Sequence, residues 1–285
     1  MNGLQIAFKD WVIPIGNQKG GQWGSPWAHT DGKLDIFKNF KGLFSDPKFW
    51  KTLVNTLRIS SLRIIFGFPI PIILVLILNE LTSEKYKKFV QGVSYLPYFI
   101  SWVIISNIFF NLTKTDSSLQ LFLEKIFGRQ IEFFGDDNLF LVILILTDIW
   151  KNAGWGTIIY FAALSNVSPE QYEAASIDGA NRFQKMLHVT VPLISGTITI
   201  YLLLQISGLL NNSFEQFYML QNSANVSRSE VLATYSYKMG IVQRKYSYTA
   251  AMNFFDSACG LILLTTSNLI SKRIVFYINY SLIKL

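Results

Sequence analysis

The sequence is poor in the residues from which catalytic and metal sites are built. Its 285 residues include one cysteine, Cys259, and two histidines, His29 and His188, which lie far apart. A single cysteine excludes an internal disulfide, and no Cys/His cluster has the spacing of a metal site. The Gly-Lys pair at 32–33 lacks the spaced glycines of an ATP-binding loop. We therefore expect no catalytic residue, no metal site and no cofactor site in this chain.

Charged residues are also scarce, at 15% of the chain, whereas 51% of the residues are hydrophobic. Soluble domains carry about 25% charged residues. The apolar residues are concentrated in long runs, which is typical of proteins that cross a membrane several times. The net charge of +7 is scattered over loops and forms no basic stripe. This distribution argues against a nucleic-acid partner and favours contact with anionic membrane lipid.

Five apolar runs are long enough to cross a hydrocarbon core, which takes about 20 residues. They are Leu53–Asn79, Phe89–Leu112, Leu139–Leu164, Pro192–Leu210 and Ala250–Ile270. Pro69 and Pro71 predict a kink in the first run, and Pro97 predicts a bend in the second. Asp148 and Lys151 lie one turn apart in the third run, so they can pair, and both must face protein or a water-filled cavity.

The sequence thus predicts an all-α integral membrane protein with about five transmembrane helices. We divide it into an N-terminal extracytoplasmic arm, a transmembrane permease domain and a cytoplasmic tail, at residues 1–52, 53–270 and 271–285. The short loop with Lys85, Lys87 and Lys88 falls on the same side as the tail and the loop at 165–190. The positive-inside rule makes that side cytoplasmic.

The polar loop between the third and fourth runs has the pattern of two ordered helices. Ser168 is a favourable N-cap, Pro169 suits the first helical position, and Gln171 completes an S-x-x-Q capping box. Gly179 predicts a stop or a sharp bend. A second helical stretch, Ala180–Thr190, runs into the fourth apolar segment. On these features alone, an amphipathic loop at the membrane interface remains the plain alternative.

Within this loop, the stretch EAASIDGANRFQKMLHVTVP resembles the EAA loop of binding-protein-dependent ABC importer permeases. Their pattern is E-A-A, three residues, G, and a later Pro. In that family the loop is cytoplasmic and its short helix sits in a groove of the ATPase subunit. The resemblance implies the transmembrane fold of an ABC type I importer. It assigns contact with the ATPase subunit to Glu173, Ala174, Ala175, Asp178, Gly179 and Ala180. Simple helix propensity is the alternative reason for the alanines.

Most of the remaining chain is similar to one branch of the carbohydrate-type permeases, which imports oligosaccharides derived from complex polysaccharides. The similar stretches are GLQIAFKD (3–10), WGSPW (23–27), FWKTLVNTLRIS (49–60), FGFPIPIILVLILNE (66–80), YLPYFISWVI (95–104), DIWKNAGWGTIIYFAAL (148–164) and ATYSYKMGI (233–241). Members of this branch normally have about six spans, one of them ahead of the QIAFKD segment. We therefore expect the present sequence to lack the first of these spans.

The resemblance implies a permease subunit of an ATP-driven ABC importer in a bacterial plasma membrane, translocating a sugar or an oligosaccharide. The implied partners are a second permease subunit, ABC ATPase subunits that bind the ATP, and an extracytoplasmic sugar-binding protein. An ABC permease for an amino acid or a peptide is one alternative. An ion-coupled secondary transporter, with Asp148 and Lys151 as an ion relay, is another.

Candidate residues for the sugar path are the polar and aromatic side chains within the spans. Aromatic rings offer an apolar face to a sugar ring, and amide groups both donate and accept hydrogen bonds. The candidates are Trp102, Asn107, Asp148, Asn152, Trp155 and Asn253. The alternative roles are interfacial anchors for the tryptophans and interhelical hydrogen bonds for the asparagines.

Overall fold

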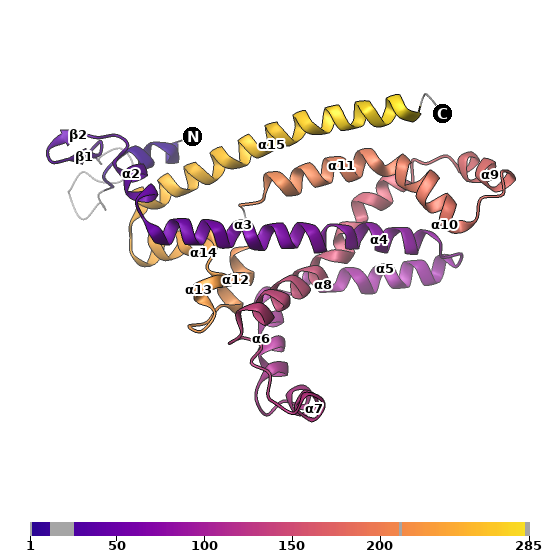
Figure 1. The fold of residues 1–285 in the computed structure, drawn as a ribbon, viewed down its shortest axis with the longest axis horizontal. Coiled ribbons are helices and arrows are strands. Elements are labelled where there is room, and N and C mark those ends of the chain that lie inside the picture. Colours follow the sequence, from indigo (N-terminus) through magenta and orange to yellow (C-terminus); the bar gives the residue numbers. More distant parts are fainter. Residues whose placement is uncertain (1, 12–25, 211–212, 283–285) are drawn as a thin grey trace. The chain divides into compact units, whose positions relative to one another are not determined.

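A computed structural model describes residues 2–11, 26–210 and 213–282 (Figure 1). Most of the WGSPW stretch and the last residues of the predicted tail, 283–285, lie outside the described residues. The first half of the chain contains η1 (Asn2–Phe8), β1 (His29–Thr30), β2 (Lys33–Leu34), α2 (Lys38–Phe44), α3 (Pro47–Gly67), α4 (Pro69–Asn79), α5 (Glu84–Phe99), α6 (Trp102–Thr113), α7 (Ser118–Phe127) and α8 (Asp137–Leu164).

The second half of the chain continues with helical elements only, as far as it is described. They are α9 (Pro169–Ile177), α10 (Arg182–Lys185), η2 (Met186–Thr190), α11 (Val191–Ser207), α12 (Phe214–Leu220), α13 (Val226–Ser229), α14 (Leu232–Tyr237), η3 (Lys238–Val242) and α15 (Tyr246–Leu282). The predicted helical class is therefore confirmed. The exception is the short antiparallel hairpin of β1 and β2, whose turn has positive φ at Asp31 and Gly32 (51° and 76°).

Four helical stretches in the described residues are long and apolar enough to cross a membrane. They are Pro47–Asn79, Asn138–Leu164, Arg182–Ser207 and Tyr246–Ser271. The first begins before the predicted Leu53 and is interrupted at Phe68, which precedes Pro69 at the first position of α4. Phe68 keeps helical angles (φ −61°, ψ −40°), so the prolines interrupt the helix without a sharp bend. The fifth predicted span, Ala250–Ile270, lies inside α15.

The second predicted span differs from the structure, because Phe89–Leu112 is not one continuous helix. Helices α5 and α6 meet at an angle of 94°. Pro97 removes a backbone donor near the end of α5, and Ile100 and Ser101 take extended backbone angles. The side chain of Ser101 then caps α6 by accepting a hydrogen bond from the amide of Ile104. The bend predicted at Pro97 is present, but it breaks the span.

The chain forms two compact units, one from residues 1–60 with 207–269 and the other from 61–206 with the chain from Ile270 onward. The core of the first unit joins α2, the start of α3, the residues after α11, α14, η3 and α15 through Leu43, Phe49, Leu53, Leu210, Leu232, Tyr235, Met239 and Met252. In the second unit, α8 packs against both α4 and α5 (Figure 1). A further core there joins α4, α8 and α11 through Val75, Leu76, Tyr160, Leu164 and Ile194.

Candidate functional site

The first arm of the coupling loop, as we call residues 165–190, is the short helix α9. Ser168 accepts a hydrogen bond from the amide of Glu170, and Pro169 occupies the first helical position, as predicted. The amide of Ala180 donates to the carbonyl of Ala175 at 2.9 Å, and that of Gly179 to Ser176 at 3.1 Å. These two bonds, with φ of +80° at Gly179, form a Schellman motif. Gly179 therefore ends the helix in a turn that satisfies the carbonyls of Ala175 and Ser176.

The second arm carries the capping box that was predicted for the first. The box forms at Asn181 and Gln184 instead of at Ser168 and Gln171, because Asn181 starts the helix of this arm. As predicted, the arm runs into the next apolar segment. Helix α10 passes through the π-helical turn η2 directly into α11. In a π turn a carbonyl accepts from the amide five residues later instead of four. This change of partner just before Pro192, which has no amide hydrogen, lets the helix continue.

Side-chain hydrogen bonds join the two arms. The hydroxyls of Tyr172 and Thr190 share a hydrogen bond of 3.1 Å. The ammonium group of Lys185 donates to the hydroxyl of Ser176 at 2.7 Å. Between the arms lies an open hollow of about 380 Å³, lined by Gln171, Ala174, Ala175, Asp178, His188, Val189, Pro192 and Leu193. Side-chain contacts therefore connect α9 to the second arm, whose backbone continues directly into α11.

The predicted ATPase-contact residues lie together on α9 and its C-terminal turn. Glu173, Ala174, Asp178 and Gly179 are exposed, whereas Ala175 and Ala180 are half-buried in the Schellman turn. The prediction did not include two large apolar side chains on the same loop, Ile177 and Phe183, which are 87% and 64% exposed. The available signal was an apolar residue on each side of the Gly179 turn in an otherwise polar stretch.

A second candidate region lies where α5 approaches α8 and then breaks; we call it the α5–α8 junction. Asp148 of α8 is buried and forms an ion pair with Arg63 of α3. The amide of Asn152 also donates to the Asp148 carboxylate at 2.9 Å. An ion pair with an added hydrogen bond is the arrangement that a buried carboxylate requires. The prediction that this charge faces protein is therefore confirmed, with Arg63 as its partner.

Lys151 supports the break between α5 and α6. Its ammonium group donates to the carbonyls of Tyr98 (2.7 Å), Pro97 (3.4 Å) and Ile100. Pro97 and Tyr98 belong to the last turn of α5 and Ile100 is its C-cap residue, where the helix end carries a partial negative charge; the amide of Ile100 also donates to the carbonyl of Pro97 at 3.2 Å. The ring centroids of Tyr98 and Trp102 lie 5.6 Å and 5.5 Å from the same nitrogen. Lys151 and Asp148, predicted as able to pair, are thus each held by other groups.

Four of the six candidate path residues gather at this junction. Trp102 starts α6, Asp148 and Asn152 lie on α8, and Trp155 stacks on Tyr98 with centroids 4.3 Å apart. Asn107 lies further along α6, where it accepts a hydrogen bond from Asn111. Asn253 belongs to the other compact unit and accepts a hydrogen bond from Ser236. The structure therefore does not place Asn107 or Asn253 in the cluster.

Close backbone contact fixes the junction. A Cβ atom on Gly154 of α8 would lie 1.9 Å from the carbonyl oxygen of Ser94 on α5. No residue larger than glycine fits there while the two helices stay at this distance. Among the residues that the structure describes, no group of three His, Cys, Asp or Glu side chains could hold a metal ion. The two candidate regions are thus a rigid exposed loop and a tightly packed polar cluster within the spans.

Comparison with known proteins places these features in context. The profile of the family described as "Binding-protein-dependent transport system inner membrane component" matches residues 67–283. Protein LplB of Bacillus subtilis is 42% identical over 96% of this chain and 82% of its own length. The polygalacturonan/rhamnogalacturonan transport system permease protein YteP of the same organism is 39% identical over the same shares.

The fold is also similar to a solved structure. A chain of a bacterial ABC transporter involved in the import of the acidic polysaccharide alginate has a TM-score of 0.83 and 32% sequence identity. The match covers 95% of the present chain and 88% of that chain. The coupling loop, α8 and the α5–α6 break all lie within the region that the family profile matches.

Proposed function

This chain belongs to the family of binding-protein-dependent transport system inner membrane components, and we propose that its coupling loop is the part that engages the ATPase of an ABC importer. The chain is a multi-pass component of the bacterial plasma membrane. It is a transporter subunit, not an enzyme. It works with a second permease subunit, with ATPase subunits that hydrolyse the ATP, and with an extracytoplasmic binding protein. Membership of this family excludes the alternative of an ion-coupled secondary transporter.

The observation that carries this proposal is the continuity of the loop with a membrane span. Helix α9 is held to the second arm by two side-chain hydrogen bonds, and that arm continues without a break into α11. A rigid body displaced at one end moves at the other. Closure of the ATPase dimer would therefore shift α11 and change the side to which the path is open.

The ATPase contact itself would combine apolar and polar groups. Ile177 and Phe183 offer apolar surface that a groove can bury, and Glu173 and Asp178 surround it with acceptors for basic side chains. Interfaces commonly have this arrangement of an apolar centre and a polar rim. The small Ala174 and Gly179 let the partner approach closely.

For the cargo we propose a sugar or an oligosaccharide. YteP, by its name, serves polygalacturonan and rhamnogalacturonan transport, and the solved relative takes part in alginate import. Both names concern polysaccharides, which favours sugar over amino acids or peptides. The α5–α8 junction would form part of the path wall, since Trp155 is 42% exposed beside the buried Asp148 and Lys151.

The orientation that we propose puts the coupling loop in the cytoplasm. The Arg182–Ser207 helix is long enough to cross the membrane, so the segment after it lies on the other side. That segment packs against the start of α3: Asn55 donates to the carbonyl of Glu230 at 3.2 Å. The N-terminal arm would then be extracytoplasmic. The tail after residue 270 would be cytoplasmic.

The test exchanges one charge on α9. We expect Glu173→Lys to insert normally but to lose binding to the ATPase subunit, with ATP-driven uptake at least about tenfold lower, because a reversed charge at an interface is costly. Glu84→Lys, on the exposed first turn of α5, is the matched control. Pull-down of the ATPase from detergent-solubilised complex, together with uptake into proteoliposomes, measures both effects. Unchanged binding and uptake in Glu173→Lys would remove this assignment.

A further inference from the structure

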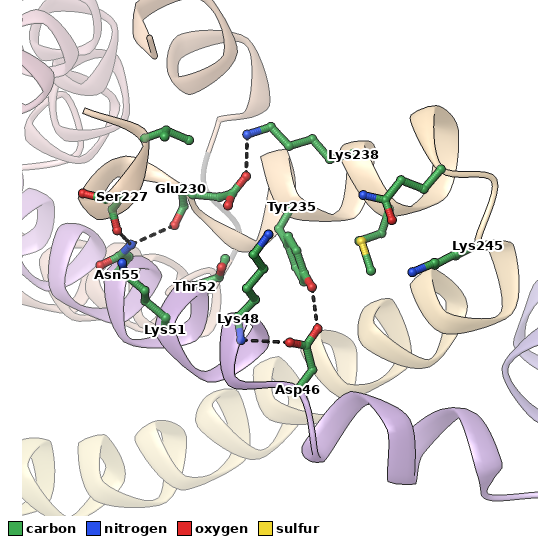
Figure 2. A pocket seen from close by; sticks show the side chains of 13 residues that line it. Asp46, Lys48, Lys51, Thr52, Asn55, Ser227, Glu230, Tyr235, Lys238 and Lys245 are labelled. Atoms are coloured by element: carbon green, nitrogen blue, oxygen red, sulfur yellow. Dashed lines mark hydrogen bonds and ion pairs between the residues drawn. The ribbon is translucent and has the colours of Figure 1, made fainter. Parts of the chain in front are cut away.

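A second cavity lies in the compact unit formed by residues 1–60 and 207–269, whereas both regions described above belong to the other unit. It is partly enclosed and has a volume of about 560 Å³; Figure 2 shows its lining side chains. It is lined by Asp46, Lys48, Lys51, Thr52, Asn55, Val226, Ser227, Glu230, Tyr235, Lys238, Met239, Gln243 and Lys245. We call it the lysine pocket. Its size falls within the range of about 300–1,000 Å³ for small-ligand sites.

The lining carries four lysines and two carboxylates, and both carboxylates already have partners. Lys238 forms an ion pair with Glu230 at 2.5 Å. Asp46 accepts hydrogen bonds from the hydroxyls of Tyr235 (2.6 Å) and Tyr248 (2.7 Å). Burial acts to raise the pKa of Asp46, but these hydroxyls and the backbone amides of Lys48 and Phe49 outweigh it and hold the pKa below its ordinary value. Both carboxylates therefore stay ionised, and four lysines against two carboxylates leave the lining with an excess of positive charge.

Three lysines of the pocket, Lys48, Lys51 and Lys245, have no ion-pair partner among the residues that the structure describes, and all three are exposed. Figure 2 shows Lys48 and Lys51 reaching up from α3, while Lys238 and Lys245 come from the segment across the pocket. Lys48 and Lys51 lie three positions apart on one helix face, where like charges repel. An anion bound between them would relieve this repulsion.

The remaining lining suits hydroxyl groups. Thr52 and Asn55 are buried at 2% and 8% exposure and lie at the side of α3, with Ser227 and Gln243 among the residues across from them. The amide of Asn55 donates to the carbonyls of Glu230 and Ser227, so its side chain is fixed in position. The carbonyl oxygen of the fixed Asn55 amide and the nearby hydroxyl groups, beside ammonium groups without an ion pair, match a ligand that carries both hydroxyls and carboxylates.

We propose that the lysine pocket is an entry site for acidic oligosaccharides, whose uronate carboxylates bind Lys48, Lys51 and Lys245. The inference rests on the proposed function, because it supplies the sugar class and the direction of travel. By the proposed orientation the pocket lies on the extracytoplasmic side, where a binding protein delivers its cargo. A concave pocket with fixed polar groups favours a sugar over the flat docking of an acidic protein surface.

The test measures uptake of two cargoes that differ only in charge. The complete complex, with its binding protein, is placed in phosphatidylcholine vesicles so that no anionic headgroup competes for the lysines. Uptake of a short oligogalacturonate is compared with that of the same oligosaccharide after reduction of its carboxyl groups to alcohols. We expect Lys48→Gln with Lys51→Gln to lower the acidic-to-neutral uptake ratio about tenfold, equivalent to about 1.4 kcal/mol.

Two further variants control for charge and for fold. Lys48→Arg with Lys51→Arg keeps both charges and should keep the uptake ratio. Lys33→Gln with Lys114→Gln removes two exposed lysines outside the pocket and should also leave the ratio unchanged. The defect of the glutamine pair should diminish at high salt, since exposed charges are screened. Size-exclusion chromatography of each complex verifies assembly.

Each other outcome overturns a specific statement. An unchanged uptake ratio in the glutamine pair, with both cargoes transported, removes the lysine pocket and leaves the importer function intact. Equal losses for both cargoes, together with weaker docking of the sugar-free binding protein, would make the lysines a protein-docking surface instead. Wild-type uptake of the neutral cargo alone contradicts the acidic class. An assembled wild-type complex that transports neither sugar contradicts the proposed function itself.

Discussion

The coupling loop and the α5–α8 junction are both polar, but their contacts span very different distances along the chain. In the loop, Tyr172 and Thr190 are 18 positions apart, and Lys185 and Ser176 are nine. At the junction, Arg63 and Asp148 are 85 positions apart, and Lys151 reaches carbonyls more than 50 positions away. The loop is therefore a local structure that is exposed to a partner. The junction exists only when three helices are already packed together.

This difference has an energetic consequence. An exposed polar contact such as that of Lys185 with Ser176 contributes little to global stability, because water can solvate both groups when the helix unfolds. A buried charge that loses its partner is costly, since nothing else solvates it. Changes in the loop should therefore affect coupling more than folding, and changes at the junction should affect folding first.

The largest effect should come from the closest contact at the junction. Gly154→Leu places a side chain where even a Cβ atom would lie 1.9 Å from the Ser94 carbonyl oxygen, so α5 and α8 must separate. We expect a loss of more than about 3 kcal/mol and no recoverable folded complex. Gly92→Leu is the matched control, because no atom lies within 4 Å of its added Cβ. The measurement is size-exclusion chromatography of the two solubilised variants. Equal profiles of Gly154→Leu and Gly92→Leu would refute the close contact.

A smaller loss of stability should follow from Lys151→Met. The substitution keeps the length of the side chain but leaves the carbonyls of Pro97, Tyr98 and Ile100 without this donor. We expect a loss of about 2–4 kcal/mol, measured as a lower melting temperature of the purified complex. Lys85→Met removes an exposed lysine on α5 as the control. If both variants melt alike, Lys151 does not support the break.

The smallest effect on stability, with a large effect on transport, should come from the loop. Gly179 has φ of +80° and open space around it, so Gly179→Val is strained by its backbone and not by a clash. We expect about 1–2 kcal/mol of local strain, near-normal insertion and a loss of ATP-driven uptake. Gly179→Asn should retain uptake, because asparagine tolerates this conformation. Equal uptake in the two variants would show that the turn is not required.

The two regions also differ in how far they could be predicted. The cap at Ser168 and the turn at Gly179 follow from neighbouring residues, so the sequence was sufficient for them. The capping box was assigned to Ser168 instead of Asn181, since both positions carry a suitable residue with glutamine three places later. At the junction, the burial of Asp148 was expected but Arg63 was not identified as its partner. Sequence spacing carries no information on a partner from another helix.

The sequence by itself determined the number and composition of the apolar runs, the helical class and the shape of the coupling loop. These properties depend on local propensity, capping and hydrophobic length, which act between near neighbours. Only the tertiary structure decided that the second run breaks and that Lys151 supports the break. It also decided that lysines from α3 line the same pocket as lysines from the segment before α15. Packing decides these features, because each depends on which side chains, distant in the sequence, the fold brings close together.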